Sequence, residues 1–423
     1  MSKTRILSIF CVSLFLLLLL VNFTIGGDAY AQKSAKKIKI GMALDLTGLY
    51  QDSWGLIAAQ DYIKWVNETR YIPGVELEVM WSDTGGSLDK GLAFFKHEKE
   101  AGCMVVQHAT TGENVALKKL LEEAKIIGFS QTVTEEPIYE PPAWNFCGIM
   151  GTKGHANCFL HSVKIDWAKR GMKRAPVVGC LGWDNIIGKI SIKYVKENYE
   201  RFGLKFGTEA LISPAATEFR SQWRALKDAK CDYVMISVAS SQVGGILKQR
   251  HELEMTDIKT INPAWNVSEA AWGSLALPAS MLQGAGMIDY YGQINEINKP
   301  GAWLLKQCAD THRKYHGKEL DWRTGSNYIM FYAINWQLVE AIKEAAARVG
   351  PEKVNSEEIK YSIEHLKRKD VGGLFGGSDF TEYPGDRIGM THFRYCDIVD
   401  KPGGPIRVPT TDWIYMDYRP TGK

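Results

Sequence analysis

Several short motifs resemble catalytic or cofactor-binding signatures, but each lacks a residue that its chemistry needs. In Gly182–Lys189, five residues separate the two glycines where a phosphate-binding loop has four, and Ile190 stands where that loop has a magnesium-binding hydroxyl. Gly284–Gly286 lacks the third glycine of a dinucleotide loop. His251-Glu252 opens a segment without the second histidine of the HExxH zinc motif. These motifs give no support for nucleotide or zinc chemistry.

Carboxylates at strand ends are the remaining candidates for a general base. Asp45, Asp83 and Asp184 each end or follow a strand-like apolar run. An aspartate at such a position more often caps a helix or forms a turn. The chain also has no GxSxG elbow and offers no pairing of a nucleophile with a base. We therefore expect no catalytic residue, no metal site and no cofactor.

The N-terminus has the composition of an export signal. Lys3 and Arg5 precede the apolar run Ile6–Val21, and Ala29-Tyr30-Ala31 has the small-x-small pattern that a signal peptidase accepts. The apolar run has 16 residues, whereas a helix needs about 20 to span a bilayer. We predict that residues 1–31 are a signal peptide, cleaved after Ala31, and that the mature protein is periplasmic. An uncleaved anchor is the alternative.

The composition is that of an ordinary globular protein. The chain has 423 residues, of which 45% are apolar and 23% charged, so two or three domains are expected. Its 51 basic and 48 acidic side chains are interspersed, and basic runs do not exceed pairs such as Lys36-Lys37. A nucleic-acid backbone would need a concentrated basic surface, so nucleic acid is not an expected partner.

Seven cysteines would remain after cleavage of the signal, in a compartment that permits disulfides. Because the number is odd, at least one must be unpaired. Cys103, Cys180 and Cys231 lie in or beside apolar runs, where cysteine usually acts as a small buried hydrophobe. We expect at most one or two disulfides, without an assignment. The others are Cys147, Cys158, Cys308 and Cys396.

The elements that would position any site follow from a hydrophobic period that switches repeatedly between 2 and 3.6. Short alternating or continuously apolar runs predict strands, and wider stripes between them predict helices. Alternating strands and helices favour parallel sheets covered on both faces. About ten strands exceed one comfortable sheet, so an α/β fold with two doubly wound domains is predicted. The strands are expected at 38–44, 75–81, 104–106, 126–129, 146–149, 177–181, 206–212 and 233–238.

The C-terminal third departs from this alternation. Two long helical patterns, at 301–316 and 327–349, are followed by a third after Asn355-Ser356. The Gly-rich segment Gly372–Gly377 then introduces short predicted strands up to Tyr418.

A series of motifs in a fixed order resembles the periplasmic solute-binding proteins of the branched-chain amino acid and amide ABC importers. The resemblance covers essentially the whole mature chain, and its specificity comes from order and spacing rather than from any one motif. The motifs are Ile38–Gly41, Leu46–Gly48, Trp54-Gly55, Trp81–Thr84, Gln107–Gly112, Ser130–Thr134, Trp183–Asn185 with Gly188, Tyr332-Ala333, and Phe380 with Pro384–Arg387.

The resemblance implies a type I architecture: two doubly wound parallel-sheet lobes are joined by three chain crossings, and they close on a ligand held between them. Lobe 1 would comprise 38–151 plus 292–390. Lobe 2 would comprise 152–291 plus 391–423. The ligand would lie at the carboxyl ends of the parallel strands.

The resemblance also places paired threonines at the ligand. Thr110 and Thr111 precede a predicted helix, so their hydroxyls and the free N–H groups of its first turn could hold a carboxylate. Thr132 and Thr134 occupy the corresponding loop one strand later. The alternative is that these threonines only cap helices, which needs no ligand.

The departures from the family pattern concern the second lobe. Amino-acid-binding members hold the substrate ammonium with an acidic side chain from the loop that here reads Asn262–Asn266, and Ala264 or Trp265 stands in its place. An ammonium buried without a carboxylate would be strongly disfavoured. Ile187 likewise stands where members of the family have an aromatic residue. Trp54, Trp183 and Trp265 could form an aromatic wall opposite the threonines, with Asn185 beside it; the alternative for each tryptophan is a place in the core.

The expected function is therefore capture of a small carboxylate, apolar or aromatic and without an ammonium, and its delivery to an inner-membrane ABC permease by a monomeric protein. Amino-acid or amide binding by the same fold, or a sensory receptor subunit, are the alternatives. An enzyme comes third, because the sequence supplies no catalytic pair.

Overall fold

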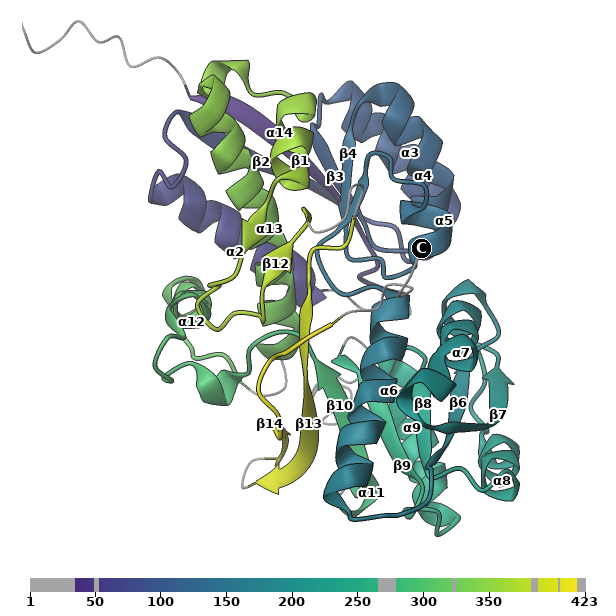
Figure 1. The fold of residues 1–423 in the computed structure, drawn as a ribbon. Coiled ribbons are helices and arrows are strands. Elements are labelled where there is room, and N and C mark those ends of the chain that lie inside the picture. Colours follow the sequence, from purple (N-terminus) through teal and green to yellow (C-terminus); the bar gives the residue numbers. More distant parts are fainter. Residues whose placement is uncertain are drawn as a thin grey trace, which may run out of the picture.

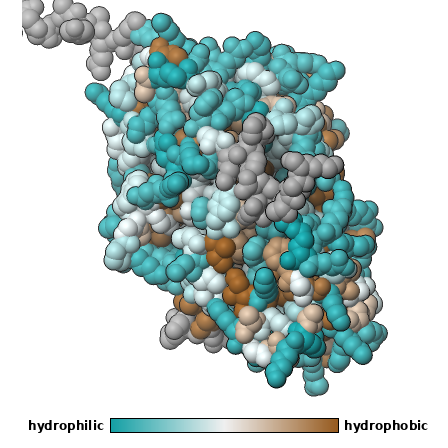
Figure 2. Space-filling model, in the orientation of Figure 1, coloured by the Kyte–Doolittle hydropathy of each residue, from teal (hydrophilic) through white to brown (hydrophobic). Residues whose placement is uncertain are grey.

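A computed structural model describes residues 35–48, 53–264, 279–321, 325–381, 387–401 and 404–416. The predicted signal peptide and Trp265 lie outside the described residues. No helix in these ranges combines the length and the apolar character needed to cross a membrane. In the face shown in Figure 2, hydrophilic residues cover most of the surface and hydrophobic ones appear in small groups, as expected for a surface in contact with water.

The first sheet is wholly parallel and has the strand order β2-β1-β3-β4-β5. Its central strands β3 and β4 are buried along their whole length, because helices cover both faces of such a sheet. The strands are β1 (Lys36–Leu44), β2 (Val75–Asp83), β3 (Val105–His108), β4 (Ile127–Ser130) and β5 (Asn145–Cys147).

Helices flank this sheet in two groups, as Figure 1 shows. Helix α2 packs against α12 and α13, α13 packs against α14, and α3 packs against α4. Several of these helices come from the distant C-terminal part of the chain, so lobe 1 is assembled from two separated segments. The helices are α2 (Ser53–Glu68), α3 (Leu88–Glu100), α4 (Thr111–Ala124), α5 (Glu135–Tyr139), α12 (Trp303–His316), α13 (Gly325–Val349) and α14 (Ser356–Glu364).

The second sheet has the order β14-β13-β10-β9-β8-β6-β7, with β15 paired to β13. Strands β6 to β10 run parallel, whereas β13 and β14 add an antiparallel edge. The strands are β6 (Val177–Trp183), β7 (Lys205–Ile212), β8 (Tyr233–Ser237), β9 (Lys259–Pro263), β10 (Ala285–Asp289), β13 (His392–Lys401), β14 (Gly404–Pro409) and β15 (Ile414–Tyr415). The helices are α6 (Thr152–Lys169), α7 (Ile186–Asn198), α8 (Arg220–Asp228), α9 (Ser240–Glu252) and α11 (Ala279–Leu282).

The predicted α/β fold with two doubly wound sheets is confirmed. The prediction of only short strands in the C-terminal tail is wrong for β13, which has 10 residues. This strand pairs with β10, β14 and β15, and those pairings extend it beyond the length that its local pattern indicates. The lobe bounds 38–151 plus 292–390 and 152–291 plus 391–423 stay predictions.

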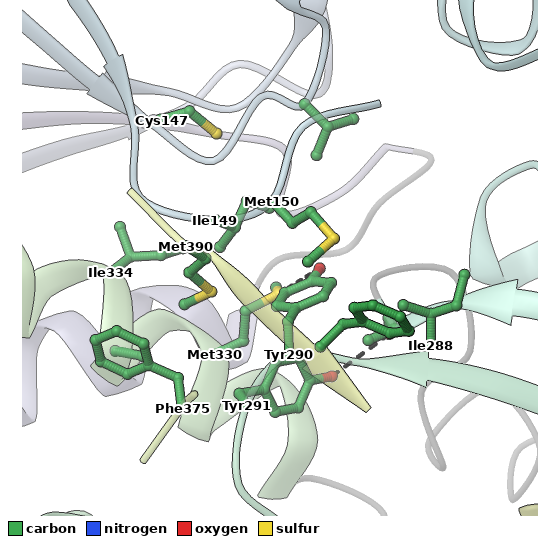
Figure 3. Packing of buried hydrophobic residues seen from close by; sticks show 14 of the residues in the cluster. Cys147, Ile149, Met150, Ile288, Tyr290, Tyr291, Met330, Ile334, Phe375 and Met390 are labelled. Carbon is green, nitrogen blue, oxygen red and sulfur yellow. Dashed lines mark hydrogen bonds between the residues drawn. The ribbon is translucent and has the colours of Figure 1, made fainter. Parts of the chain in front are cut away.

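Apolar side chains from α13, from the end of β10 and from the segment before α6 pack together at the junction of the two sheets. Figure 3 shows Met150, Met330 and Met390 around the ring of Tyr290, and the Tyr290 hydroxyl lies 3.9 Å from Met330 Sδ. Methionine is flexible and polarisable, so it fills irregular space well. The cluster therefore packs α13 against the end of β10, largely through methionine side chains.

A buried polar cluster lies at the same junction. Arg407 and Asp289 are fully buried, and Arg407 Nη1 lies 3.1 Å from Asp289 Oδ1. Arg407 also donates to the hydroxyl of Ser326 at the start of α13. Arg394 Nη1 donates to Glu296 Oε1 at 2.8 Å, and Arg394 Nη2 lies 3.6 Å from Asp289 Oδ2. The two arginines come from β14 and β13, so this cluster ties the C-terminal hairpin to β10 and to α13.

All seven cysteines of the predicted mature chain are buried, and none forms a disulfide within the described part of the chain. The expected burial of Cys103, Cys180 and Cys231 is confirmed. Burial raises the pKa of the Cys231 thiol to about 11 and that of Cys103 to about 12, the latter with a contribution from Glu98. These thiols therefore stay protonated at neutral pH and act as packing groups.

Candidate functional site

The loops that carry the predicted site follow the carboxyl ends of the parallel strands, and these ends point toward the junction of the lobes in Figure 1. Thr110 and Thr111 follow β3, and Thr132 and Thr134 follow β4. The two threonine loops are in contact, because Asn114 Nδ2 on α4 donates to Thr132 Oγ1 at 2.8 Å. The structure therefore brings the loop that carries Thr110 and Thr111 into contact with Thr132.

Thr110 and Thr111 have different tasks at the start of α4. Thr110 Oγ1 accepts a hydrogen bond from the Glu113 N–H at 3.2 Å, and Glu113 Oε2 accepts one from the Thr110 N–H at 3.4 Å. This is a capping box, so the helix-capping alternative holds for Thr110. The Thr111 hydroxyl is buried and has no hydrogen-bond partner among the described residues. The first N–H groups of a helix also lack an intrahelical partner.

Thr132 and Thr134 differ in the same respect: one hydroxyl is hydrogen-bonded and the other is not. The Thr132 hydroxyl accepts from Asn114 and lies 3.3 Å from the His108 carbonyl oxygen, so it is engaged within the lobe. Thr134 precedes α5 but its side chain makes no cap hydrogen bond. Its hydroxyl is buried and has no partner in the described part of the chain. Thr111 and Thr134 are thus the two threonines whose buried hydroxyls have no partner among the described residues.

The N-cap at α4 gives a direct stability prediction. Thr110→Ala should lower the free energy of unfolding by about 1 kcal/mol, because it leaves the Glu113 N–H without its acceptor. Urea denaturation measures the change. Ser87→Ala is the control, since Ser87 Oγ caps α3 through a longer bond of 3.5 Å at an exposed position; its loss should be smaller. An equal loss at both caps would contradict the assigned geometry.

A fully buried group of charges lies beneath the α4 turn. His108 Nε2 is 2.9 Å from Glu98 Oε2, and His108 Nδ1 is 3.5 Å from Glu113 Oε2. Burial lowers the pKa of His108, but the hydrogen bonds and charges of Glu113 and Glu98 outweigh it and raise the pKa to about 9. Sequence reasoning missed this group. The Thr110-x-x-Glu113 spacing of a capping box could have identified Glu113, but no local signal links Glu98 to His108.

In the second lobe, Trp183 ends β6 and is almost fully buried. Its indole N–H donates to Gln242 Oε1, and Gln242 Nε2 donates to the Ala216 carbonyl at 2.8 Å. The Trp183 N–H is therefore engaged within the lobe. Asn185 Oδ1 caps α7 by accepting from the Ile187 N–H at 3.1 Å, and Ile187 is buried. These contacts fix the turn after β6.

Trp54 lies in the first turn of α2 and is partly buried. Its ring centroid is 6.2 Å from that of His312 on α12, which also belongs to the first-sheet side of the molecule. The predicted wall of Trp54, Trp183 and Trp265 stays a prediction, because Trp265 lies outside the described residues.

A carboxyl group that sequence reasoning missed lies at the first crossing between the sheets. Glu135 is buried, and its Oε1 accepts a hydrogen bond from the Lys153 N–H of α6 at 2.8 Å. Desolvation raises the pKa of Glu135 to about 8, although bonds from the Lys153 N–H and the charge of Lys153 oppose the rise. Next to it, Glu136 Oε1 lies 3.3 Å from Lys193 Nζ on α7. Helix α5 thus contacts both α6 and α7 across the junction.

Within the described ranges, no three histidine, cysteine or acidic side chains are grouped so that they could hold a metal ion. The arrangement offers hydroxyl and N–H donors at the end of one sheet and apolar side chains at the end of the other. Such a site can bind an anion with an apolar body.

Several proteins of known structure have a similar architecture. One is a branched-chain amino acid ABC transporter protein from Thermus thermophilus, solved with bound valine. It is 18% identical in sequence, with a TM-score of 0.75, and the alignment covers 91% of this chain and 98% of that one. A fatty acid ABC transporter substrate-binding protein from Thermomonospora curvata is 19% identical with a TM-score of 0.72, covering 90% and 93%. A Rhodopseudomonas palustris solute-binding protein in complex with 3,4-dihydroxybenzoic acid is 16% identical with a TM-score of 0.72, covering 90% and 98%.

These likenesses show the fold, which is that of type I periplasmic binding proteins. Comparison with curated protein sequences gives no match. Residues 37–391 match the family model described as periplasmic binding protein. Because that match spans most of the chain, the protein belongs to the periplasmic binding protein family.

Proposed function

We propose that this protein captures a small carboxylate with an apolar or aromatic body and no ammonium group, in the periplasm after cleavage at Ala31, and delivers it to an inner-membrane ABC permease. The observation that carries this proposal is the pair of buried hydroxyls of Thr111, in the first turn of α4, and Thr134, at the N-cap of α5, neither of which has a hydrogen-bond partner among the described residues. A buried hydroxyl without a partner is costly, so these two donors favour an occupant.

A carboxylate suits these donors for electrostatic reasons. Helix α4 has 14 residues, and the free N–H groups of its first turn carry the positive end of the helix dipole. The hydroxyls of Thr111 and Thr134 can each donate one further hydrogen bond. A carboxylate has four lone-pair sites on its two oxygens, which can accept all of these bonds together.

The absence of an acidic side chain in the described part of the opposite loop argues against an amino acid. Asn262, Pro263 and Ala264 are buried where the second sheet ends, and Asn262 Nδ2 donates to the Gly286 carbonyl oxygen at 3.2 Å. None of the three can neutralise an ammonium, and an unpaired buried ammonium is strongly disfavoured. Relatives of this fold occur in complex with 3,4-dihydroxybenzoic acid and with 4-hydroxybenzoate, and others with valine or isoleucine.

A thermal-shift screen tests the ligand class. The mature protein, unfolded and refolded to remove bound solute, would be screened against 4-hydroxybenzoate, 3,4-dihydroxybenzoate, octanoate, valine, isoleucine and small amides. A ligand at a hundred times its dissociation constant adds about 2.7 kcal/mol of stability, which raises the melting temperature visibly. We expect shifts with the acids and none with the amino acids. A shift with valine or isoleucine but with no acid would contradict the proposal.

Two threonine variants separate binding from stability. Thr111→Val and Thr134→Val should each weaken binding of the acid identified in the screen about tenfold, the effect of one lost hydrogen bond to a charged group. They should leave the free energy of unfolding of the unliganded protein unchanged or raised, because each removes a buried unpartnered hydroxyl. Thr208→Val, at a partly exposed position on β7, is the control for binding. Unchanged affinity in both test variants would contradict the assigned contacts.

A further inference from the structure

The His108, Glu98 and Glu113 side chains form a closed group whose only described polar contacts are with each other and with the α4 turn. Their exposed fractions are 1%, 0% and 0%. Glu113 Oε2 contacts both His108 Nδ1, at 3.5 Å, and the Thr110 N–H, at 3.4 Å. A single carboxylate oxygen therefore connects the imidazole ring to the backbone turn that precedes Thr111.

The backbone of His108 is tied to the same turn. Its carbonyl oxygen accepts a hydrogen bond from Asn114 Nδ2 at 2.7 Å and lies 3.3 Å from Thr132 Oγ1. Ring and carbonyl of this one residue thus connect β3, the first turn of α4 and the loop after β4. Both threonine loops of the proposed carboxylate site depend on it.

Glycines on neighbouring elements leave space for this group, and among the described residues no charge other than those of Glu98 and Glu113 is in contact with the ring. A Cβ on Gly41 of β1 would lie 2.1 Å from Glu98 Oε1, and a Cβ on Gly91 of α3 would lie 2.4 Å from Glu113 Oε1. From α3 the ring faces Glu98 and the edge of Phe95, and from α4 it faces Glu113. Farther out, Lys39 on β1 and Cys103 before β3 interact electrostatically with one another, and Cys103 with Glu98.

We propose that His108 is a positioning residue for the carboxylate site: its protonated ring holds Glu113 under the first turn of α4 and thereby fixes the N–H groups and the Thr111 hydroxyl that receive the ligand. This rests on the proposed function for the ligand, but the ordering of the turn does not need a ligand.

Loss of the ring proton has two consequences in this geometry. The ring then loses its positive charge, and with it the ion pair between His108 Nδ1 and Glu113 Oε2 at 3.5 Å. The buried group also becomes more negative by one charge, directly beneath the helix terminus where an anion would bind, and the low dielectric of the interior strengthens that repulsion. Both effects disfavour a bound carboxylate.

The pH range follows from the raised pKa. The free His108 side chain has a pKa of 6.5 and the folded one about 9, so the contribution of these contacts is fully present below pH 6.5. It is lost as the pH rises through about 9. We therefore expect the α4 turn and the affinity for a carboxylate to be constant from pH 6 to 8 and to decline above that range.

The test compares the wild-type mature protein with His108→Gln, which keeps a neutral polar side chain, and with the exposed control His97→Gln. Nuclear magnetic resonance follows the His108 ring and the Thr111 and Gly112 amides from pH 6 to 10, and calorimetry measures the binding of octanoate, which has no group that titrates in this range. In the wild type and the control, amide protection and affinity should fall together with the ring titration. In His108→Gln, affinity at pH 7 should be about tenfold lower, as for one charge-assisted hydrogen bond, and both profiles should be flat.

The outcomes separate the two proposals. If no acid binds the wild type, the proposed ligand class fails, while amides that follow the ring titration still support the positioning role. If an acid binds but the amides and the affinity do not follow the ring, the positioning role is overturned. If His108→Gln does not fold, the wild-type titration is compared with that of Glu113→Gln instead. In Glu113→Gln, the Thr111 and Gly112 amides should no longer follow the titration of the His108 ring. Amides that still follow it would overturn the positioning role.

Discussion

Arg407→Leu is expected to lower the free energy of unfolding by about 3 kcal/mol, the lower end of the cost of breaking a buried ion pair. The substitution leaves the carboxylate of Asp289 fully buried without its partner at 3.1 Å. It also removes the donors to Ser326 and to the Tyr291 hydroxyl. Arg394, 3.6 Å from Asp289, compensates in part, which is why the lower end of the range applies.

Urea denaturation of the two proteins at neutral pH measures this loss. The matched control is Arg313→Leu on α12, where an exposed arginine pairs with Asp310 and Glu319; exposed pairs contribute less than about 1 kcal/mol. The double variant Asp289→Asn with Arg407→Leu should lose less than the sum of the single losses, because no uncompensated charge remains at that position. An Arg407→Leu protein as stable as the control variant would contradict the role assigned to the buried pair.

Glu135→Gln is expected to make the protein more stable than the wild type at pH 8 to 9 and equally stable near pH 5. Burial raises the pKa of Glu135 from 4.5 to about 8, so between pH 4.5 and about 8 the native carboxyl keeps its proton while the unfolded chain releases it. The unfolded state then binds fewer protons, and the wild type loses stability as the pH rises from 4.5 to about 8. The full difference is on the order of 5 kcal/mol.

The substitution keeps an oxygen that can accept the Lys153 N–H, now bonded at 2.8 Å, so the start of α6 should be preserved. Urea denaturation at intervals from pH 5 to 9 gives the difference between variant and wild type directly. Glu123→Gln is the control, because Glu123 is exposed and 3.6 Å from Lys119; its difference should stay near zero at each pH. A Glu135→Gln difference that does not grow with pH would show that this carboxyl is ionised in the native protein.

The sequence alone predicted the features that depend on neighbours along the chain. The alternation between periods of 2 and 3.6 predicted the five strands of the first sheet and strands β6, β7 and β8 of the second, but not β9 or β10. The family pattern placed paired threonines after β3 and β4. The nucleotide-binding motifs were excluded because a glycine or a hydroxyl is missing from them, and the zinc motif because its second histidine is missing. Each of these inferences rests on spacing within one strand, turn or helix, which a single sequence contains in full.

The tertiary structure decided which of the predicted site residues are already engaged. Thr110 and Thr132 have identical chemistry to Thr111 and Thr134, yet only the first two find partners within the lobe. Asn114 makes the difference for Thr132, and it is 18 residues away in the chain. The sequence could not show which of the four hydroxyls have hydrogen-bond partners, because this depends on a contact between separate loops.

The buried charges were beyond sequence analysis for the same reason. Arg407 meets Asp289 across 118 residues of chain, and Glu98 meets His108 only because α3 packs over the end of β3. Local patterns report which face of an element is apolar, but they do not report which charged side chains converge when elements pack. The sequence therefore determined the two-sheet fold and predicted the loops of the candidate site, whereas the packing of distant segments determined which charges converge there and which hydroxyls lack a partner.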